Sequence, residues 1–224
     1  MNEELFLSHL SMLHLESLLN DIKYSNLKKL TKFGFKAYSQ SDEDGIIQEI
    51  FSRIGITNRI FVEFGVGGGT ENNTLYLLKS GWEGLWIECD LNNCNSIKEK
   101  FKNTLNKRLF LAQQIITKDN INEIISKYYT GDIDLLSVDI DGNDLYVLDA
   151  INCIQPKVII CEYNEKFRPP LKWSIKYDEN HKWDGTDYHG ASLAAINDVL
   201  TKKNYKLVCC NITGVNCFLC IKNI

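Results

Sequence analysis

A run of glycines separates a strand-like segment of this sequence from a helix-like one. Residues 60–63 are largely apolar and end on Glu63, and Gly65, Gly67 and Gly69 follow at alternate positions. Glycine lets a backbone turn sharply and approach a ligand closely, and the first turn of the following helix presents free N–H groups. The pattern predicts a cradle for a nucleotide-like cofactor at the end of this strand.

The spacing of the glycines indicates which cofactor. A dinucleotide fingerprint counted from Gly65 needs a third glycine where Thr70 stands, whereas an acidic residue followed by G-x-G-x-G is typical of enzymes that use S-adenosylmethionine (SAM). Glu88 ends a second apolar strand 25 residues after Glu63. An ionised carboxylate there accepts hydrogen bonds from both ribose hydroxyls. We therefore predict that Glu88 binds the ribose of SAM, with Asp90 as the alternative by register.

Two further pairs of polar side chains follow neighbouring strand-like segments. Asp139 and Asp141 stand two residues apart after one segment, and Glu162 and Asn164 do so after the next. Residues two apart on a strand project to the same side, so we expect four oxygen ligands at one edge of the sheet. We predict that Asp139 also faces the cofactor and that Asp141, Glu162 and Asn164 bind Mg²⁺ or Mn²⁺. The same groups would equally suit hydrogen bonds to a polar acceptor.

A base is needed if the acceptor must lose a proton. Asp139, Asp141, Glu162 and His189 are the candidates, and His189 stands where the chain re-enters a helix after a long polar and aromatic stretch. The alternative role of His189 is a hydrogen bond within its own loop. We expect residues 163–190 to be an insertion that binds the acceptor. Basic residues there hint at an anionic acceptor and aromatic ones at a stacked ring: Arg168, Lys172, Lys176, Lys182, Trp173 and Trp183.

Short apolar strands alternate with helical segments along most of the chain. This rhythm predicts an α/β fold, a doubly wound, Rossmann-like parallel sheet with helices on both faces, ending in an antiparallel hairpin. The predicted strands span residues 60–63, 84–88, 109–113, 133–139, 157–162, 205–210 and 217–221, and the helices span 72–79, 93–105, 120–128, 144–151 and 191–202. We expect Asn73, in the helix after the glycines, to contact the cofactor.

Length and composition indicate one main domain. The chain has 224 residues, of which 44% are hydrophobic, and no low-complexity linker divides it. We expect a helical extension at residues 1–30, with apolar residues at helical spacing that could cap the core or form a homo-oligomer contact, before a cofactor-binding domain at 31–224. The net charge of −4 argues against a nucleic-acid partner. The sequence predicts no membrane span or signal peptide, and therefore a cytoplasmic protein.

Eight cysteines invite a zinc or disulfide interpretation. Cys217 and Cys220 stand three apart on a predicted strand and would point to opposite faces. We therefore expect them to be small buried hydrophobic residues rather than joint ligands of one metal ion.

Several short motifs together resemble the FkbM-type methyltransferases, from about residue 37 to the C-terminus. They are Tyr38-Ser39-Gln40 with Glu43-Asp44-Gly45, Val62-Glu63-Phe64-Gly65, Trp86-Ile87-Glu88, Asp139-Ile140-Asp141-Gly142, Cys161-Glu162-Tyr163-Asn164, Gly190-Ala191-Ser192-Leu193 and Gly214-Val215-Asn216. The resemblance implies a class I SAM-dependent O-methyltransferase that acts on sugar, polyketide or capsule-type small molecules. It also implies that Gln40 contacts the cofactor. A phosphate- or phosphoramidate-bearing acceptor, already ionised, would need no strong base.

Residues 141–146 have a weaker similarity to the Mg²⁺-dependent macrocin O-methyltransferases. Asn143 interrupts the Asp-Gly-Asp-Leu-Tyr run of that family, and Glu162-Tyr163 stands where it has paired aspartates. Two alternatives remain: an NAD(P)-dependent sugar oxidoreductase, which Thr70 disfavours, and a non-catalytic SAM-binding module.

Overall fold

One seven-stranded sheet forms the centre of the molecule. The computed structural model describes residues 3–222, without the side chains of residues 3–6, 8 and 9, so the outermost ends of the predicted extension and domain lie outside the described residues. The strand order is β3-β2-β1-β4-β5-β7-β6, with β7 antiparallel to both of its neighbours and the other pairs parallel. The strands are β1 (Ile60–Phe64), β2 (Glu83–Glu88), β3 (Leu109–Gln113), β4 (Gly131–Val138), β5 (Ile154–Glu162), β6 (Tyr205–Cys210) and β7 (Asn216–Ile221). The predicted doubly wound sheet with a terminal hairpin is confirmed.

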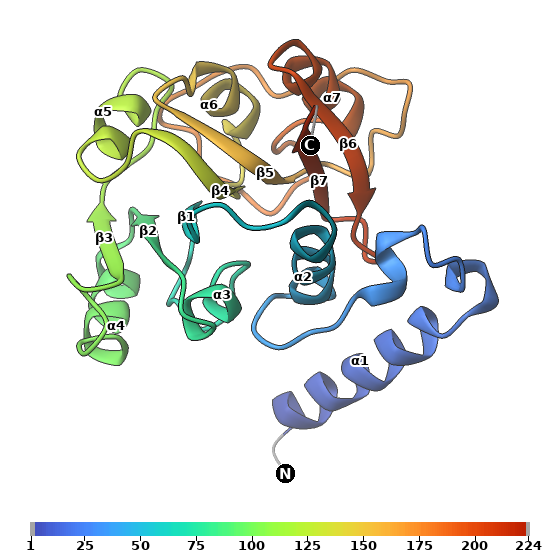
Figure 1. Ribbon diagram of the computed structural model, residues 1–224. Coiled ribbons are helices and arrows are strands. Elements are labelled where there is room, and N and C mark those ends of the chain that lie inside the picture. The colour runs from blue at the N-terminus through green and yellow to red at the C-terminus, as the bar shows by residue number, and fades with distance from the viewer. Residues whose placement is uncertain (1–2, 223–224) are drawn as a thin grey trace.

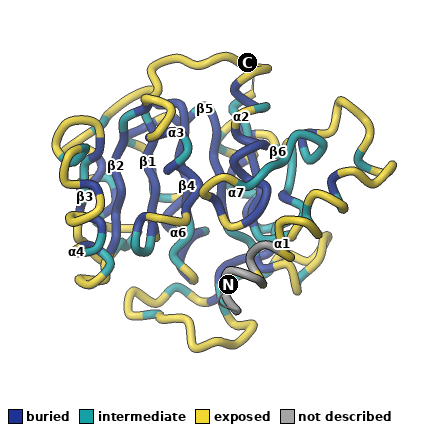
Figure 2. The backbone as a smooth tube through the Cα atoms, turned by 90° about the horizontal axis from the view of Figure 1, so that it is seen from below, coloured by how far each residue is buried: buried dark blue, intermediate teal, exposed yellow. Residues whose placement is uncertain are grey.

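Helices cover both faces of this sheet (Figure 1). One core contains side chains from α5 (Ile121–Ser126), α6 (Asp144–Ala150) and α7 (Leu193–Lys202), and the other contains side chains from α2 (Glu43–Ile54), α3 (Leu75–Lys79) and α4 (Leu91–Lys100). Alternate residues of a strand serve opposite cores: Val62 and Phe64 of β1 join the first and Phe61 the second. The strands are buried and the loops at their ends are exposed (Figure 2), so ligand-binding groups are expected at those ends.

Helix α2 was missed by the sequence interpretation, which saw only motif residues in this region. Its apolar residues Ile46, Ile47, Ile50 and Phe51 recur at helical spacing and are all buried. The start of the helix is hard to recognise in the sequence, because acidic residues are expected to be exposed and three consecutive ones there are buried: Asp42, Glu43 and Asp44. They accept hydrogen bonds from loop backbone and asparagine groups, so the start of α2 organises the neighbouring loops.

The N-terminal helix α1 (Glu3–Leu19) extends away from the sheet (Figure 1). Leu7, Leu10 and Leu13 are exposed, and Leu19 is the buried apolar residue at its end. The helix therefore covers little of the core, in contrast to one of its two predicted roles. No helix within residues 3–222 has the length and apolar character needed to cross a bilayer.

The C-terminal hairpin agrees with the cysteine prediction. Cys217 packs in the core beneath α5, α6 and α7, whereas Cys220 packs against the core on the other face. These two thiols therefore lie on opposite faces of the sheet.

A buried carboxylate fixes the entry into β1. Asp134 on β4 is fully buried and accepts backbone hydrogen bonds from Thr57, Asn58 and Arg59, with the Lys157 ammonium 4.0 Å away. Arg59 has a positive φ of 60°, a conformation that costs energy for a residue with a side chain. The carboxylate therefore holds a strained turn at the amino end of the sheet.

Replacement of Asp134 by alanine should leave the backbone N–H groups of Thr57, Asn58 and Arg59 without their acceptor. We expect a loss of about 3 kcal/mol in the free energy of unfolding, measured by urea denaturation. Asp132→Ala, at an exposed position two residues earlier, serves as the control with a change below about 0.5 kcal/mol. Equal losses in the two variants would contradict this role.

Candidate active site

A cavity of about 520 Å³ opens at the carboxyl ends of the central parallel strands. The strand order reverses between β1 and β4, and ligands of open α/β sheets bind at such a point. The volume lies in the usual range for small-molecule sites. The lining combines the glycine loop and the end of β2 with the ends of β4 and β5 and the insertion: Gln40, Gly65, Gly67, Ile87, Glu88, Cys89, Asn93, Gln114, Ile115, Ile116, Asp139, Ile140, Asp141, Asn143, Glu162, Glu179, His181, Trp183 and His189.

The glycine loop needs glycine at its first position for two reasons. Gly65 has a φ of 70°, and a Cβ there would lie 1.7 Å from the carbonyl oxygen of Asp139. Gly67 also has a positive φ and lines the cavity. Gly69 does not line it, because this glycine packs against Trp86 and Ile97 instead. Among the three predicted glycines, the structure thus places Gly65 and Gly67 at the cavity.

Glu88 lies where a ribose-binding carboxylate is expected, at the end of β2. Its Oε2 accepts from the Gly67 N–H at 2.9 Å and its Oε1 from the Asp90 N–H at 2.8 Å. Each oxygen retains further acceptor capacity towards the cavity. Asp90, the alternative by register, instead caps α4 by accepting from the Asn93 N–H.

Glu63 lies behind the glycine loop rather than in the main cavity. Its carboxylate accepts from the Asn73 and Thr74 N–H groups and from the Thr74 hydroxyl, and burial raises its pKa to about 7. The side-chain amide of Asn73 donates to Ser137 Oγ at 3.1 Å. These bonds hold residues 70–74 as a turn, and α3 therefore begins later than predicted. Glu63 and Asn73 line a smaller adjoining cavity together with Gln40.

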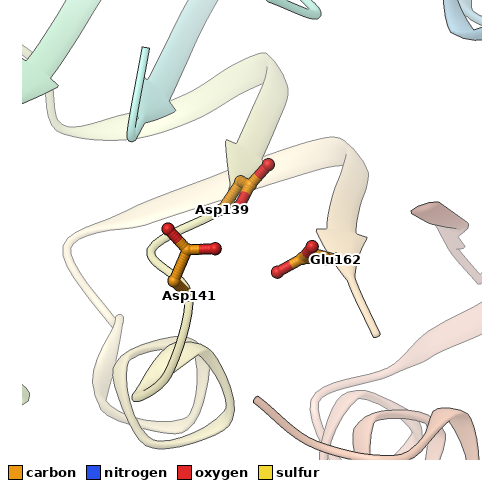
Figure 3. A group of neighbouring side chains, drawn as sticks. All are labelled: Asp139, Asp141 and Glu162. Atoms are coloured by element: carbon orange, nitrogen blue, oxygen red, sulfur yellow. The ribbon is translucent and has the colours of Figure 1, made fainter. Parts of the chain in front are cut away.

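Three acidic side chains meet at the ends of β4 and β5 (Figure 3). One carboxylate oxygen from each of Asp139, Asp141 and Glu162 lies within 4.8 Å of the others. The reason differs from the strand alternation that we expected, since β4 ends at Val138 and Asp141 adopts a positive φ of 56°. A left-handed turn, and not the pleat of a strand, brings Asp141 to the group.

Asp144 holds this turn in place. Its carboxylate is buried and accepts from the backbone N–H groups of Ile140 and Gly142. Asp144 is the first residue of α6, and its carboxylate binds the preceding loop instead of capping the helix.

The electrostatics of the acidic group are unusual. Burial, and then repulsion by neighbouring carboxylates, raise the pKa values of Asp139 and Glu162 well above their usual range. Among the described residues, no Lys or Arg lines the cavity to offset these charges. Asp139 and Glu162 are therefore expected either to keep their protons or to bind a cation.

Asn164 and His189 are in contact, but only His189 lines the cavity. The Asn164 amide is fully buried, donates to the carbonyls of Asp187 and His189, and accepts from the Lys166 N–H, so it anchors the insertion away from the acidic group. His189 lines the cavity, with its ring 5.9 Å from that of Trp183.

The insertion contributes acidic and aromatic side chains to the cavity lining, and none of its Lys or Arg residues. Lys172 forms an ion pair with Asp198, and Trp173 stacks on Phe167 with ring centroids 4.0 Å apart. Both therefore have partners within the protein and are absent from the cavity lining, as are the other basic residues on which an anionic acceptor was inferred: Arg168, Lys176 and Lys182.

Sequence reasoning missed part of the lining. Cys89 and the run from Gln114 to Ile116 directly follow the carboxyl ends of β2 and β3, which is a signal that could have identified them. Glu179 and His181 come from the insertion, where no periodic pattern predicts which side chains turn inward.

The model of the methyltransferase FkbM domain matches residues 48–207. The chain belongs to this family of SAM-dependent methyltransferases. Its sheet is that of the class I, Rossmann-like methyltransferases. The NAD(P)-dependent oxidoreductase alternative is accordingly not favoured. No curated protein sequence matches the chain.

Solved methyltransferase structures resemble this FkbM-family chain at low sequence identity. The O-methyltransferase TomG from Streptomyces achromogenes, solved in complex with SAM, is 12% identical with a TM-score of 0.50, over 94% of this chain and 95% of that one. A SAM-dependent methyltransferase from Clostridium acetobutylicum is 10% identical with a TM-score of 0.47, over 98% and 99% of the two chains. The glycopeptide N-methyltransferase MtfA is 13% identical with a TM-score of 0.46, over 80% and 96%. The likeness to TomG shows the fold alone.

The raised pKa values predict how stability depends on pH. The folded protein holds protons on Asp139 and Glu162 that the unfolded chain releases above about pH 4, so stability should fall as pH rises from there towards the folded-state pKa values. Each such proton contributes up to about 1.4 kcal/mol per pH unit.

Glu162→Gln should flatten this dependence, because glutamine does not titrate. The measurement is the melting temperature between pH 5 and pH 9, with Glu165→Gln at an exposed neighbouring position as the control. Superimposable slopes for wild type and Glu162→Gln would show that the acidic group is not buried as described.

Proposed function

We propose that this protein is a SAM-dependent O-methyltransferase of a small polar acceptor. One observation supports this most strongly: a single cavity has the glycine loop and Glu88 at one end and Asp139, Asp141, Glu162 and His189 at the other. A donor bound at the first end would face an acceptor bound at the second.

The cofactor end is proposed to work through hydrogen bonds and close backbone approach. Glu88 accepts from the ribose hydroxyls, and the Gly67 N–H that it binds keeps the loop against it. Gly65 and Gly67 leave room for the ligand, and Gln40 closes the end of the cavity near the smaller one. Glu63, Gly69 and Asn73 act on the cofactor indirectly, by holding the loop.

At the acceptor end, the acidic lining supports a neutral, sugar-type hydroxyl as the acceptor. Asp139, Asp141 or His189 would accept its proton, a role worth on the order of 10²- to 10⁴-fold in rate. Trp183 offers an exposed ring to stack on a sugar face. A phosphate-type acceptor would need a bound cation here, and a nucleic acid would meet the wrong charge.

SAM, when bound, supplies a methyl group on a positively charged sulfur for in-line displacement. The protein's part is to hold donor and acceptor in line, to take up the proton and to keep water out. Carboxylates buried beside the sulfonium would stabilise its positive charge in the ground state, which does not accelerate the reaction. The rate enhancement would therefore come from the orientation of donor and acceptor and from proton removal.

A divalent cation is the second component that we propose. Asp139, Asp141 and Glu162 offer three hard oxygen donors from two adjacent strand ends, which suits Mg²⁺ or Mn²⁺, and a cation would offset the burial and the repulsion that raise the pKa values of Asp139 and Glu162. Asn164 is left out of the ligand set because the insertion backbone occupies its amide. The cation would lower the pKa of an acceptor hydroxyl.

Mn²⁺ should raise the melting temperature of wild type at pH 8 but not that of Asp141→Asn, and equal shifts in the two proteins would reject the site.

Glu88→Gln should weaken S-adenosylhomocysteine binding by about 100-fold, because an amide replaces one of the two acceptor oxygens with a donor. Calorimetric titration measures this, and circular dichroism checks that the variant is folded. Glu99→Gln, exposed on α4, is the matched control. Unchanged affinity in Glu88→Gln would overturn the ribose assignment.

We also propose that a second copy of the chain covers the exposed face of α1. Leu7, Leu10 and Leu13 recur every three residues and are 57%, 45% and 53% exposed. Sedimentation should show a wild-type dimer and a monomeric Leu10→Glu, Leu13→Glu variant, and a monomeric wild type would contradict the contact.

A cytoplasmic location is proposed as well, supported by eight unpaired thiols.

A further inference from the structure

The segment that follows α1 exposes apolar side chains. This segment, residues 20–33, is called the basic loop here; it contains two single-turn helices, η1 (Ile22–Tyr24) and η2 (Leu30–Phe33), and continues from the end of α1 at the periphery of the molecule (Figure 1). Ile22 is 86% exposed and Leu27 is 68% exposed, the highest values among the large apolar side chains that the structure describes. Two such side chains on one loop indicate an interaction surface more strongly than single, scattered ones do.

The same loop concentrates positive charge in an acidic protein. Its charged residues are four lysines and one aspartate: Lys23, Lys28, Lys29, Lys32 and Asp21. The loop therefore has a net charge of +3, four positive charges minus one negative, whereas the whole chain has −4. None of the four ammonium groups forms an ion pair with a described side chain. Their charge is thus available to an anionic partner.

The body of the protein holds the tip of the loop in one conformation. The guanidinium of Arg53, on α2, donates to the carbonyls of Leu27 and Lys28 at 2.8 and 3.3 Å and is itself paired with Glu49. Leu30 is buried in the core that contains side chains of α2. The exposed apolar groups are therefore presented by an ordered loop, so that little conformational entropy is lost when they bind.

The composition of the loop fits a lipid surface better than a protein partner. Protein interfaces are enriched in aromatic residues and arginine and depleted in lysine. The most exposed groups here are instead two aliphatic side chains and several lysines. Long lysine stems let the ammonium groups reach lipid headgroups while aliphatic tips enter the boundary of the acyl chains. Each lysine near an anionic membrane raises the affinity by about fivefold.

We propose that the basic loop attaches this protein to membranes that contain anionic phospholipids. Ile22 and Leu27 enter the boundary between headgroups and acyl chains, and the lysines bind the anionic headgroups. The attachment is peripheral and reversible, because two aliphatic side chains bury little apolar area. The loop lies outside the cavity lining, so this proposal does not depend on the proposed function.

Co-sedimentation with lipid vesicles tests the attachment. Wild type should bind vesicles of phosphatidylcholine with about one-third phosphatidylserine, and bind pure phosphatidylcholine vesicles at least about tenfold more weakly. A rise in NaCl from about 0.1 M to about 0.5 M should release it, because salt screens the lysine charges. Equal binding to the two kinds of vesicle would overturn the proposal. Absence of binding to both would also overturn it and leave the loop as a contact for an acidic protein.

Charge removal in the loop is the first variant to test. Lys28→Gln combined with Lys29→Gln should weaken binding to the phosphatidylserine vesicles at least about tenfold. Lys102→Gln combined with Lys107→Gln, at exposed positions after α4, is the matched control and should bind as wild type does. Equal binding by the two double variants would show that the loop is not the contact.

Removal of the apolar tips is the second variant and leaves every charge in place. Ile22→Ser combined with Leu27→Ser should also weaken binding at least about tenfold, because the aliphatic groups no longer leave water. Ile56→Ser combined with Leu91→Ser, at exposed positions elsewhere, is the control, and circular dichroism checks that the variants are folded. Wild-type affinity in the loop variant would contradict insertion of these side chains.

Discussion

The contact of Gly65 with the Asp139 carbonyl is the constraint on which the rest of the site depends. A side chain on Gly65 would place its Cβ 1.7 Å from that oxygen, so the loops after β1 and β4 can touch only because this residue has none. One loop leads to the glycine cradle and the other to the acidic group. Their contact sets the distance between Glu88, the proposed ribose ligand, and the acidic group at which we propose that the acceptor binds.

The buried carboxylates near this contact have two different roles, one structural and one chemical. Glu63, Glu88 and Asp144 accept hydrogen bonds from backbone N–H groups and thereby fix the loops that carry the site. Asp139 and Glu162 lack cationic partners among the cavity residues and have raised pKa values. The first set makes the loops rigid, and this rigidity holds the second set close together despite their repulsion. The acidic residues thus separate into those that build the site and those available for chemistry.

Much of the fold was predictable because the strands are apolar on both faces. The bounds of β3 and β6 agree with the prediction, and each of the other five strands begins or ends one to three residues away from it. Helix α2 was missed because buried acidic residues stand at its start, and two of them, Asp42 and Glu43, have partners in the remote loop at residues 211 and 212, which local patterns do not reveal.

The site was predictable where ligands follow strand ends and unpredictable where side chains have partners from elsewhere. Glu88, Asp139 and Glu162 occupy such ends and line the cavity as expected. Asn164 looked equivalent by spacing, but its amide binds the insertion. The basic residues of the insertion suggested an anionic acceptor, because a sequence does not show which way a long loop turns its side chains.

The most direct test of the central claim is calorimetric titration of the wild-type protein with S-adenosylhomocysteine and, separately, with NADH. We expect micromolar binding of S-adenosylhomocysteine and no binding of NADH, since we propose that Glu88 and the Gly65 loop form the ribose end of a SAM cavity. Binding of NADH alone, or of neither ligand, would contradict it.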